Sequence, residues 1–61
     1  MGDMWMTNVN ANLRAAGSTS ARILKVIPRS TLVEVYMCTG SWCKVKANGT
    51  IGWLALSTMT R

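Results

Sequence analysis

The sequence has no histidine and only two acidic residues, Asp3 near the N-terminus and Glu34 in the middle of the chain. General acid–base catalysis depends on positioned titratable groups, and hydrolysis of the serine type needs a histidine beside the nucleophile. Zinc sites likewise need sets of cysteine, histidine or acidic ligands. We therefore expect no catalytic residue, no metal site and no cofactor, and we interpret the chain as a non-enzymatic protein.

A long apolar run is also missing. The longest apolar stretches are short patches such as residues 53–56, whereas a membrane-spanning helix needs about 20 apolar residues, so we expect no membrane span. Residues 1–7 include an acid and lack the basic and apolar regions of a secretion signal. Either a leader has been removed, or this N-terminal segment is a tag or an extension of the first strand, or the protein works where it is made. We assign residues 8–61 to one domain.

What remains is a short, basic and rather apolar chain. Seven Lys and Arg residues against two acids give the 61 residues a formal charge of +5, and 49% of the residues are hydrophobic. That content is too high for intrinsic disorder. A chain of this size buries only about 60% of the surface that its unfolded form exposes, so we expect a marginal core with a covalent or quaternary staple.

Apolar and polar residues alternate over short segments, which predicts an all-β fold. We expect five strands, at residues 7–13, 22–27, 31–38, 42–47 and 50–55. Asn48 and Gly49 form the pair that a type I′ hairpin turn prefers, and Gly40 marks a second tight reversal. Residues 56–61 are expected to form one 3₁₀ turn or to fray. Five short strands whose edges must be covered favour a small, partly open barrel.

The spacing of Cys38 and Cys43 suits a disulfide across the hairpin between them, and we favour this over two reduced buried thiols. A disulfide would indicate an oxidising compartment, so a periplasmic or extracellular location. If Cys38 faces Cys43, strict alternation puts Cys38 on the face of Val45 and Val35 on the other face, although both valines look like core residues. We therefore predict an irregularity, either a β-bulge near residues 39–40 or a strongly coiled strand.

Motifs then follow one another in a recognisable order, at residues 12–15 (Asn-Leu-Arg-Ala), 18–20 (Ser-Thr-Ser), 26–35 (Val-Ile-Pro-Arg-Ser-Thr-Leu-Val-Glu-Val), 41–45 (Ser-Trp-Cys-Lys-Val) and 48–54 (Asn-Gly-Thr-Ile-Gly-Trp-Leu). Their order resembles the bacterial Src-homology 3 (SH3-like) domains over residues 9–59. The resemblance implies an SH3-like barrel that is a module of an exported protein and, in many members, binds peptidoglycan or other cell-wall material. The chain departs from the family at Ser30, where glycine is usual, and at Thr58, where an aromatic residue is usual.

The candidate ligand contacts are three aromatic residues and one cation: Trp42, Trp53, Tyr36 and Arg14. Alternation puts Trp42 on the outer face with Lys44 and Lys46, where its ring could carry a sugar or a peptide or could simply cover one end of the barrel. Trp53 stands at the family's Gly-aromatic position, and Tyr36 has an apolar body with a polar tip. We predict that these residues form a shallow groove for a cell-wall glycan or peptide ligand.

Two other functions remain open. The apolar N-terminal residues 4–6 could join copies of the chain, which would make it a homo-oligomeric assembly module. A small basic barrel with aromatic platforms could also bind single-stranded nucleic acid. The cations are spread along the chain and form no basic run, so we rank nucleic acid below a cell-wall ligand.

Overall fold

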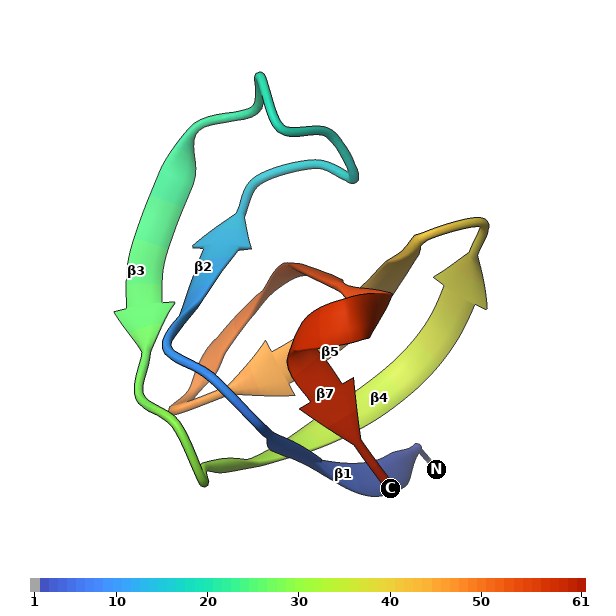
Figure 1. Ribbon diagram of the computed structural model, residues 1–61. Coiled ribbons are helices and arrows are strands. Elements are labelled where there is room, and N and C mark those ends of the chain that lie inside the picture. Colours follow the sequence, from blue (N-terminus) through green and yellow to red (C-terminus); the bar gives the residue numbers. More distant parts are fainter. Residues whose placement is uncertain (1) are drawn as a thin grey trace.

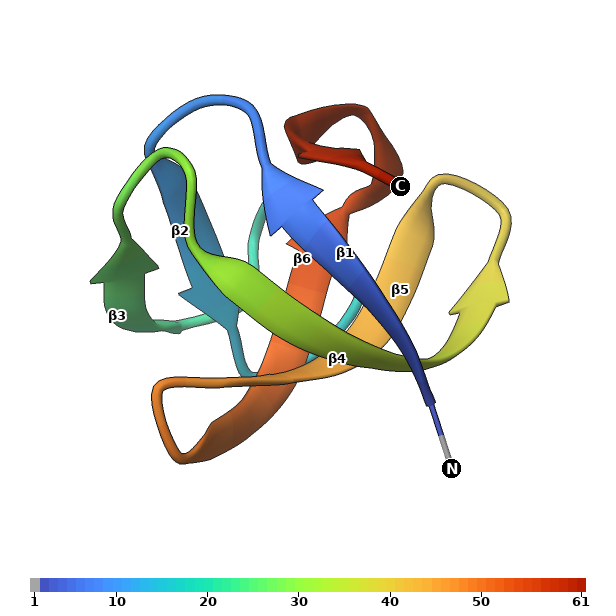
Figure 2. The same cartoon turned by 90° about the horizontal axis from the view of Figure 1, so that it is seen from below.

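Seven strands make a single antiparallel sheet in the computed structural model, which describes residues 2–61. The strand order across the sheet is β3-β2-β6-β5-β4-β1-β7, and Figures 1 and 2 show how the sheet curls on itself into a partly open, SH3-like barrel. One 3₁₀ helix, η1, precedes the last strand. The elements are β1 Asp3–Thr7, β2 Ala11–Arg14, β3 Ile23–Ile27, β4 Leu32–Thr39, β5 Trp42–Ala47, β6 Thr50–Ala55, η1 Leu56–Thr58 and β7 Met59–Thr60.

One core lies inside the curled sheet, and every strand contributes a buried apolar side chain to it. Burying a Val, Leu or Ile side chain contributes about 1.5–3 kcal/mol to folding, so this shared core is the main stabilising feature of so small a domain. The buried apolar residues are Trp5, Ala11, Leu13, Ile27, Val33, Val35, Cys43, Val45, Ala47, Leu54 and Met59.

The count of five strands is wrong, mainly because of the N-terminal region. The strand expected at residues 7–13 is two strands, since β1 ends at Thr7 and β2 begins at Ala11. Trp5 is only 9% exposed and pairs with Val33, so β1 is part of the barrel wall. The next inward position is Thr7, a polar residue that is also buried. Its hydroxyl donates a 2.7 Å hydrogen bond to the carbonyl of Pro28, which offsets the cost of burying it. This polar core position interrupts the apolar pattern.

The C-terminal residues are also more ordered than expected. The predicted 3₁₀ turn is confirmed as η1, but the chain does not fray, because β7 pairs with β1 and Met59 is buried at 6% exposure. Nothing helical within residues 2–61 has the length and apolar character that crossing a membrane would require.

Both predicted hairpins are confirmed. β5 and β6 have the expected bounds, and Asn48 and Gly49 between them adopt the positive φ values of 49° and 80° that the type I′ turn demands. Gly40, with a φ of 59°, allows the reversal between β4 and β5.

The predicted irregularity in β4 is a β-bulge, and it lies at Tyr36 rather than near residues 39–40. The pairing with β5 passes from Val35 opposite Val45 directly to Met37 opposite Lys44, which leaves Tyr36 as the extra residue. The bulge reverses the alternation. It therefore resolves the conflict between the valine pattern and the cysteine pair.

Candidate functional site

The outer face of the central strands carries two tryptophans and several cations. Alternation along β5 places Trp42 half-buried, with Lys44 and Lys46 exposed on the same face, as predicted. Trp53 on β6 lies directly opposite Lys44 of β5 and, on its other side, opposite Arg14 of β2. Trp53 therefore stands between two cations, Arg14 and Lys44, in a row across this face.

The loop between β2 and β3 folds over the two tryptophans. A Cβ atom built on Gly17 would lie 3.1 Å from Cβ of Trp42 and 3.3 Å from Cε3 of Trp53, so the loop backbone is in close contact with both. The guanidinium of Arg14 donates a 2.9 Å hydrogen bond to the carbonyl of Ala21, which ties the far end of the loop back to β2. Because Gly17 has no side chain, the loop backbone can approach both tryptophans this closely.

Two adjoining hollows open beside Trp42 and make one groove, which we call the Trp42 groove. Both are lined by Thr19, Trp42 and Ala55. The first measures about 230 Å³. Its other lining residues are Asn10, which precedes β2, then Ala11, Asn12 and Arg14 of β2, and Thr58 of η1. The second measures about 470 Å³ and extends over Ser41, Leu56 and Ser57. The groove is thus bounded by the β2–β3 loop, the end of the β4–β5 hairpin and η1.

The structure brings three of the four predicted contact residues together. Trp42 and Arg14 line the groove, and Trp53 lies beside Arg14 and touches the loop that forms one wall. Tyr36 lies apart, on the β4 bulge, and lines neither hollow. Its hydroxyl donates a 3.2 Å hydrogen bond to the carboxylate of Glu34.

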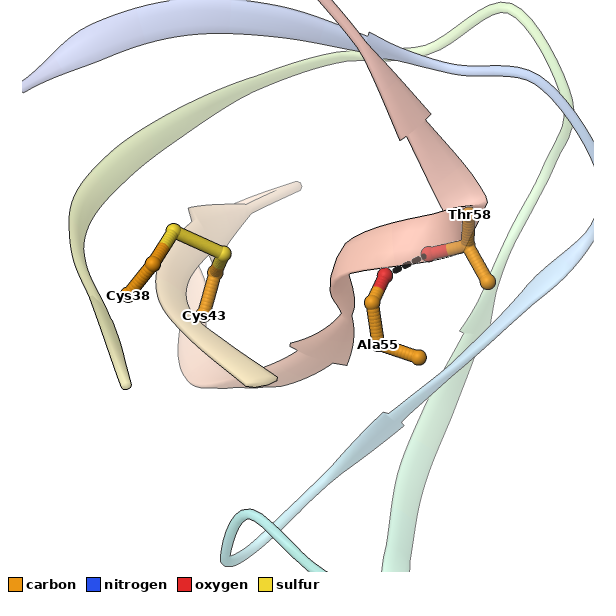
Figure 3. Close-up of a disulfide and its surroundings, with 4 residues drawn as sticks. All are labelled: Cys38, Cys43, Ala55 and Thr58. Atoms are coloured by element: carbon orange, nitrogen blue, oxygen red, sulfur yellow. Dashed lines mark hydrogen bonds between the residues drawn. A yellow bond between two sulfur atoms is a disulfide. The ribbon is translucent and has the colours of Figure 1, made fainter. Parts of the chain in front are cut away.

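Sequence reasoning missed the small polar residues of the groove. Asn12, Thr19 and Ser41 belong to motifs that carry the family resemblance, but they were not singled out as contacts. Only the fold brings them together with Asn10. Thr58 was noted from the sequence only as a departure from the resemblance, and not as a candidate contact. Its hydroxyl donates a 2.6 Å hydrogen bond to the carbonyl of Ala55 (Figure 3), and both residues line the first hollow.

The electrostatics of the groove are one-sided. Arg14 is its charged lining residue, and neither Asp3 nor Glu34 lines it. Partial desolvation, with a smaller contribution from the hydrogen bond and the negative charge of Glu34, raises the pKa of Tyr36 above its usual value of 10.0. Because Arg14 is a cation and no acidic side chain lines either hollow, the groove attracts anionic or dipolar groups.

A disulfide joins Cys38 of β4 to Cys43 of β5, directly opposite each other with a Cα–Cα distance of 4.0 Å (Figure 3). It closes the hairpin whose tip supplies Ser41 and Trp42 to the groove. Cys43 is fully buried, so the bond connects the core to the rim of the site. The disulfide therefore holds one wall of the groove in place.

The barrel, its hairpin disulfide and its surface groove define an SH3-like binding module. In the part of the chain that the structure covers, no three histidine, cysteine or acidic side chains gather in a way that could hold a metal ion. The family model described as bacterial SH3 domain matches residues 9–60, nearly the whole chain. The chain belongs to the bacterial SH3 domain family, whose members are generally binding modules. No curated protein matches the sequence closely enough to count as a relative.

Proposed function

We propose that this domain is a non-catalytic targeting module that binds peptidoglycan, with the ligand lying along the Trp42 groove. The observation that carries the proposal is the groove itself. It is lined by the indole of Trp42, by amide and hydroxyl side chains, and by Arg14, whose guanidinium is held by a hydrogen bond to Ala21. An aromatic ring can stack on a sugar face or on a peptide bond, while Asn, Ser and Thr side chains exchange hydrogen bonds with hydroxyl and amide groups. Peptidoglycan offers both kinds of partner.

The proposed location is the periplasm or the outside of the cell. The Cys38–Cys43 disulfide supports it, because such bonds form and persist in oxidising compartments. A peptidoglycan ligand is found in the same compartments, so the two proposals are consistent with each other.

Sedimentation with purified peptidoglycan tests the function. The wild-type domain should sediment with the polymer, and Trp42→Ala should weaken binding at least about tenfold, the usual cost of removing a central aromatic contact. Arg14→Gln and Trp53→Ala should weaken it as well, while Tyr36→Phe measures whether the footprint reaches the bulge. Ile51→Ala is the matched control, because Ile51 is an apolar residue of β6 that is 52% exposed and lines neither hollow of the groove.

Thermal unfolding of each variant separates lost contacts from lost structure. Wild-type protein that stays in the supernatant, or equal loss of binding in Trp42→Ala and Ile51→Ala with both variants folded, would reject the proposal.

A second candidate function is self-assembly through the outer surface of β1. Met4, Met6 and Leu32 are 55%, 42% and 57% exposed, and Met6 lies directly opposite Leu32 across the β1–β4 pair. Removing residues 1–6 would be a poor test, because Trp5 belongs to the core. Analytical ultracentrifugation of wild type and of a Met4→Ser, Met6→Ser variant is the better measurement, and a monomer in both cases excludes assembly.

A third candidate function is binding of a polyanion such as single-stranded nucleic acid. The observation that favours it is the row of Arg14, Trp53 and Lys44 on neighbouring strands, which puts an aromatic ring between two cations. Affinity for an oligonucleotide should then fall steeply with salt, because bound phosphates release counterions. No binding at low salt would exclude this candidate.

A further inference from the structure

A separate hollow of about 260 Å³ lies where the end of β1, the β3–β4 turn and β7 meet. Two arginines line it, Arg29 in the turn and Arg61 after β7. The other lining residues are Met6, Thr7, Asn8, Ser30 and Thr60, so no acidic side chain takes part. We call this hollow the Arg29–Arg61 pocket. It shares no lining residue with the Trp42 groove.

The turn that presents Arg29 is held firmly against β1. The backbone N–H of Arg29 donates a 2.9 Å hydrogen bond to the side-chain oxygen of Asn10, and the N–H of Ser30 donates one of 2.8 Å to the carbonyl of Thr7. The buried hydroxyl of Thr7 also accepts a 2.9 Å bond from the N–H of Thr31 and donates to Pro28. The backbone at Arg29 is thus fixed, while its side chain is exposed.

Arg61 is positioned by a core residue. Its guanidinium carbon lies 5.0 Å from the centre of the Trp5 ring, within the range of a cation–π contact. Beside it, the side-chain amide of Asn8 donates a 2.9 Å hydrogen bond to the hydroxyl of Thr60. The second cation and a hydroxyl are therefore held at the same wall of the pocket.

Ser30 supplies the observation that links this arrangement to a ligand. Its φ of 65° is in the left-handed region, which costs a residue with a side chain roughly 1 kcal/mol or more relative to glycine. Such strain concentrates at functional sites. Here the strained residue lines the pocket and adds a hydroxyl group next to Arg29 that a glycine would not provide.

We propose that the Arg29–Arg61 pocket binds a phosphate group, either free or as a phosphodiester. Guanidinium groups match phosphate oxygens with paired N–H donors, and two of them on separate elements can each hold a different edge of a tetrahedral anion. The hydroxyls of Ser30 and Thr60 supply neutral donors at the same place. A carboxylate offers two oxygens in one plane, whereas phosphate offers more oxygens in a tetrahedral arrangement, so donors that approach from separate elements fit phosphate better.

Titration of the whole domain tests this, with two-dimensional NMR as the readout of where binding occurs. The probes are inorganic phosphate and dimethyl phosphate, which stand for the free ion and for one unit of a phosphodiester chain. Acetate and chloride at matched ionic strength are the reference anions. We expect saturable shifts at the backbone amides of residues 6–8, 29–31 and 59–61 with at least one phosphate probe. Which of the two binds identifies the source of the phosphate.

Arg29→Gln and Arg61→Gln should each weaken phosphate binding roughly tenfold, which corresponds to about 1.4 kcal/mol. Arg22→Gln is the matched control, because Arg22 is exposed, carries the same charge and lines neither the groove nor this pocket. It should change affinity less than about twofold by long-range charge alone. The proposal is overturned if neither phosphate saturates, if acetate binds equally well, or if Arg22→Gln weakens binding as much as the pocket variants do. Peptidoglycan sedimentation is unaffected by any of these outcomes, so the two proposals fail independently.

Discussion

Val35 and Cys38 of β4 both lie opposite residues on the buried face of β5. They are three positions apart, so regular alternation would put them on opposite faces of the sheet. Val35 lies opposite Val45 and Cys38 lies opposite Cys43, two residues that alternate together on the buried side of β5. The extra residue, Tyr36, is what brings the cysteine back to this face. The bulge thus makes the disulfide compatible with a valine core, and Tyr36, the extra residue, lines neither hollow of the groove.

Reducing the disulfide should lower the free energy of unfolding by about 2 kcal/mol, the value expected for so small a closed loop. Denaturant unfolding with and without a reductant measures the difference. A Cys38→Ala, Cys43→Ala variant is the control and should not respond to reductant at all. An unchanged midpoint for the reduced wild-type protein would show that the hairpin does not depend on the bond.

Replacing Gly52 by alanine should destabilise the barrel by about 2–3 kcal/mol through overpacking. A Cβ at this position would lie 2.8 Å from the carbonyl oxygen of Arg14 and 2.8 Å from Cγ of Leu13, so β2 and β6 could not keep their present separation. Gly40→Ala is the comparison, because Gly40 has nothing within 4 Å and only its φ of 59° resists the change. We expect Gly40→Ala to cost about 1 kcal/mol. Thermal or denaturant unfolding ranks the two, and a smaller loss for Gly52→Ala would contradict the packing argument.

Ser30→Gly should raise the stability of the domain by about 1 kcal/mol, because glycine adopts the left-handed φ of 65° without strain. Ser20→Gly serves as the control, since Ser20 is exposed and has no positive φ. There the extra freedom of glycine in the unfolded chain should leave stability unchanged or slightly lower. Equal effects of the two substitutions on the unfolding midpoint would refute the strain at Ser30.

The titration of Tyr36 should be visible without interference, because it is the only tyrosine of the chain. Desolvation and the neighbouring Glu34 raise its pKa above 10.0 in the folded state. Ultraviolet absorbance of the tyrosinate should therefore appear at higher pH in the native protein than in denaturant. Glu34→Gln should move the native pKa toward 10.0 without reaching it, because desolvation remains. An identical titration in both proteins would exclude the contact with Glu34 as a cause.

The same shift makes the stability of the domain depend on pH in the alkaline range. Between pH 10 and the higher pKa of the folded state, the folded chain keeps the phenolic proton that the unfolded chain has lost. The stabilisation is therefore complete below pH 10 and is lost as the pH rises through the folded-state pKa. Tyr36→Phe should remove this part of the pH dependence. Unfolding midpoints measured on both sides of pH 10 test the sign, and a stability that rose there would contradict it.

Local chemistry explains which parts of the fold could be predicted from the sequence. The turn at Asn48 and Gly49 depends on the φ preferences of those two residues, and the strands on either side depend on simple alternation, so both were predicted with the observed bounds. β1 was missed because Thr7 is a polar residue in a core position, where hydrogen bonds to another segment satisfy it. β7 was missed because a strand of two residues has no pattern and exists only through its pairing with β1.

The candidate site divides in the same way. Trp42 and Arg14 could be singled out as an outward-facing ring and a cation in a family motif, and both line the groove. The places of Trp53 and Tyr36 could not be read from local patterns, because the fold of the β2–β3 loop and a one-residue shift in strand register both lie outside them. The loop brought Gly17 against Trp53, and the shift left Tyr36 as the unpaired residue of the bulge, outside the groove.

By itself, the sequence determined an all-β domain of the bacterial SH3 family without a histidine and with a hairpin suited to a disulfide, since turn preferences, alternation and spacing act over a few neighbouring residues. Only the tertiary structure decided which distant segments share a wall. The groove joins residues 10–14, 19, 41–42 and 55–58, and the Arg29–Arg61 pocket joins residues 6–8, 29–30 and 60–61. The reason is that long-range strand pairing around one buried core sets these neighbours, and no local preference encodes them.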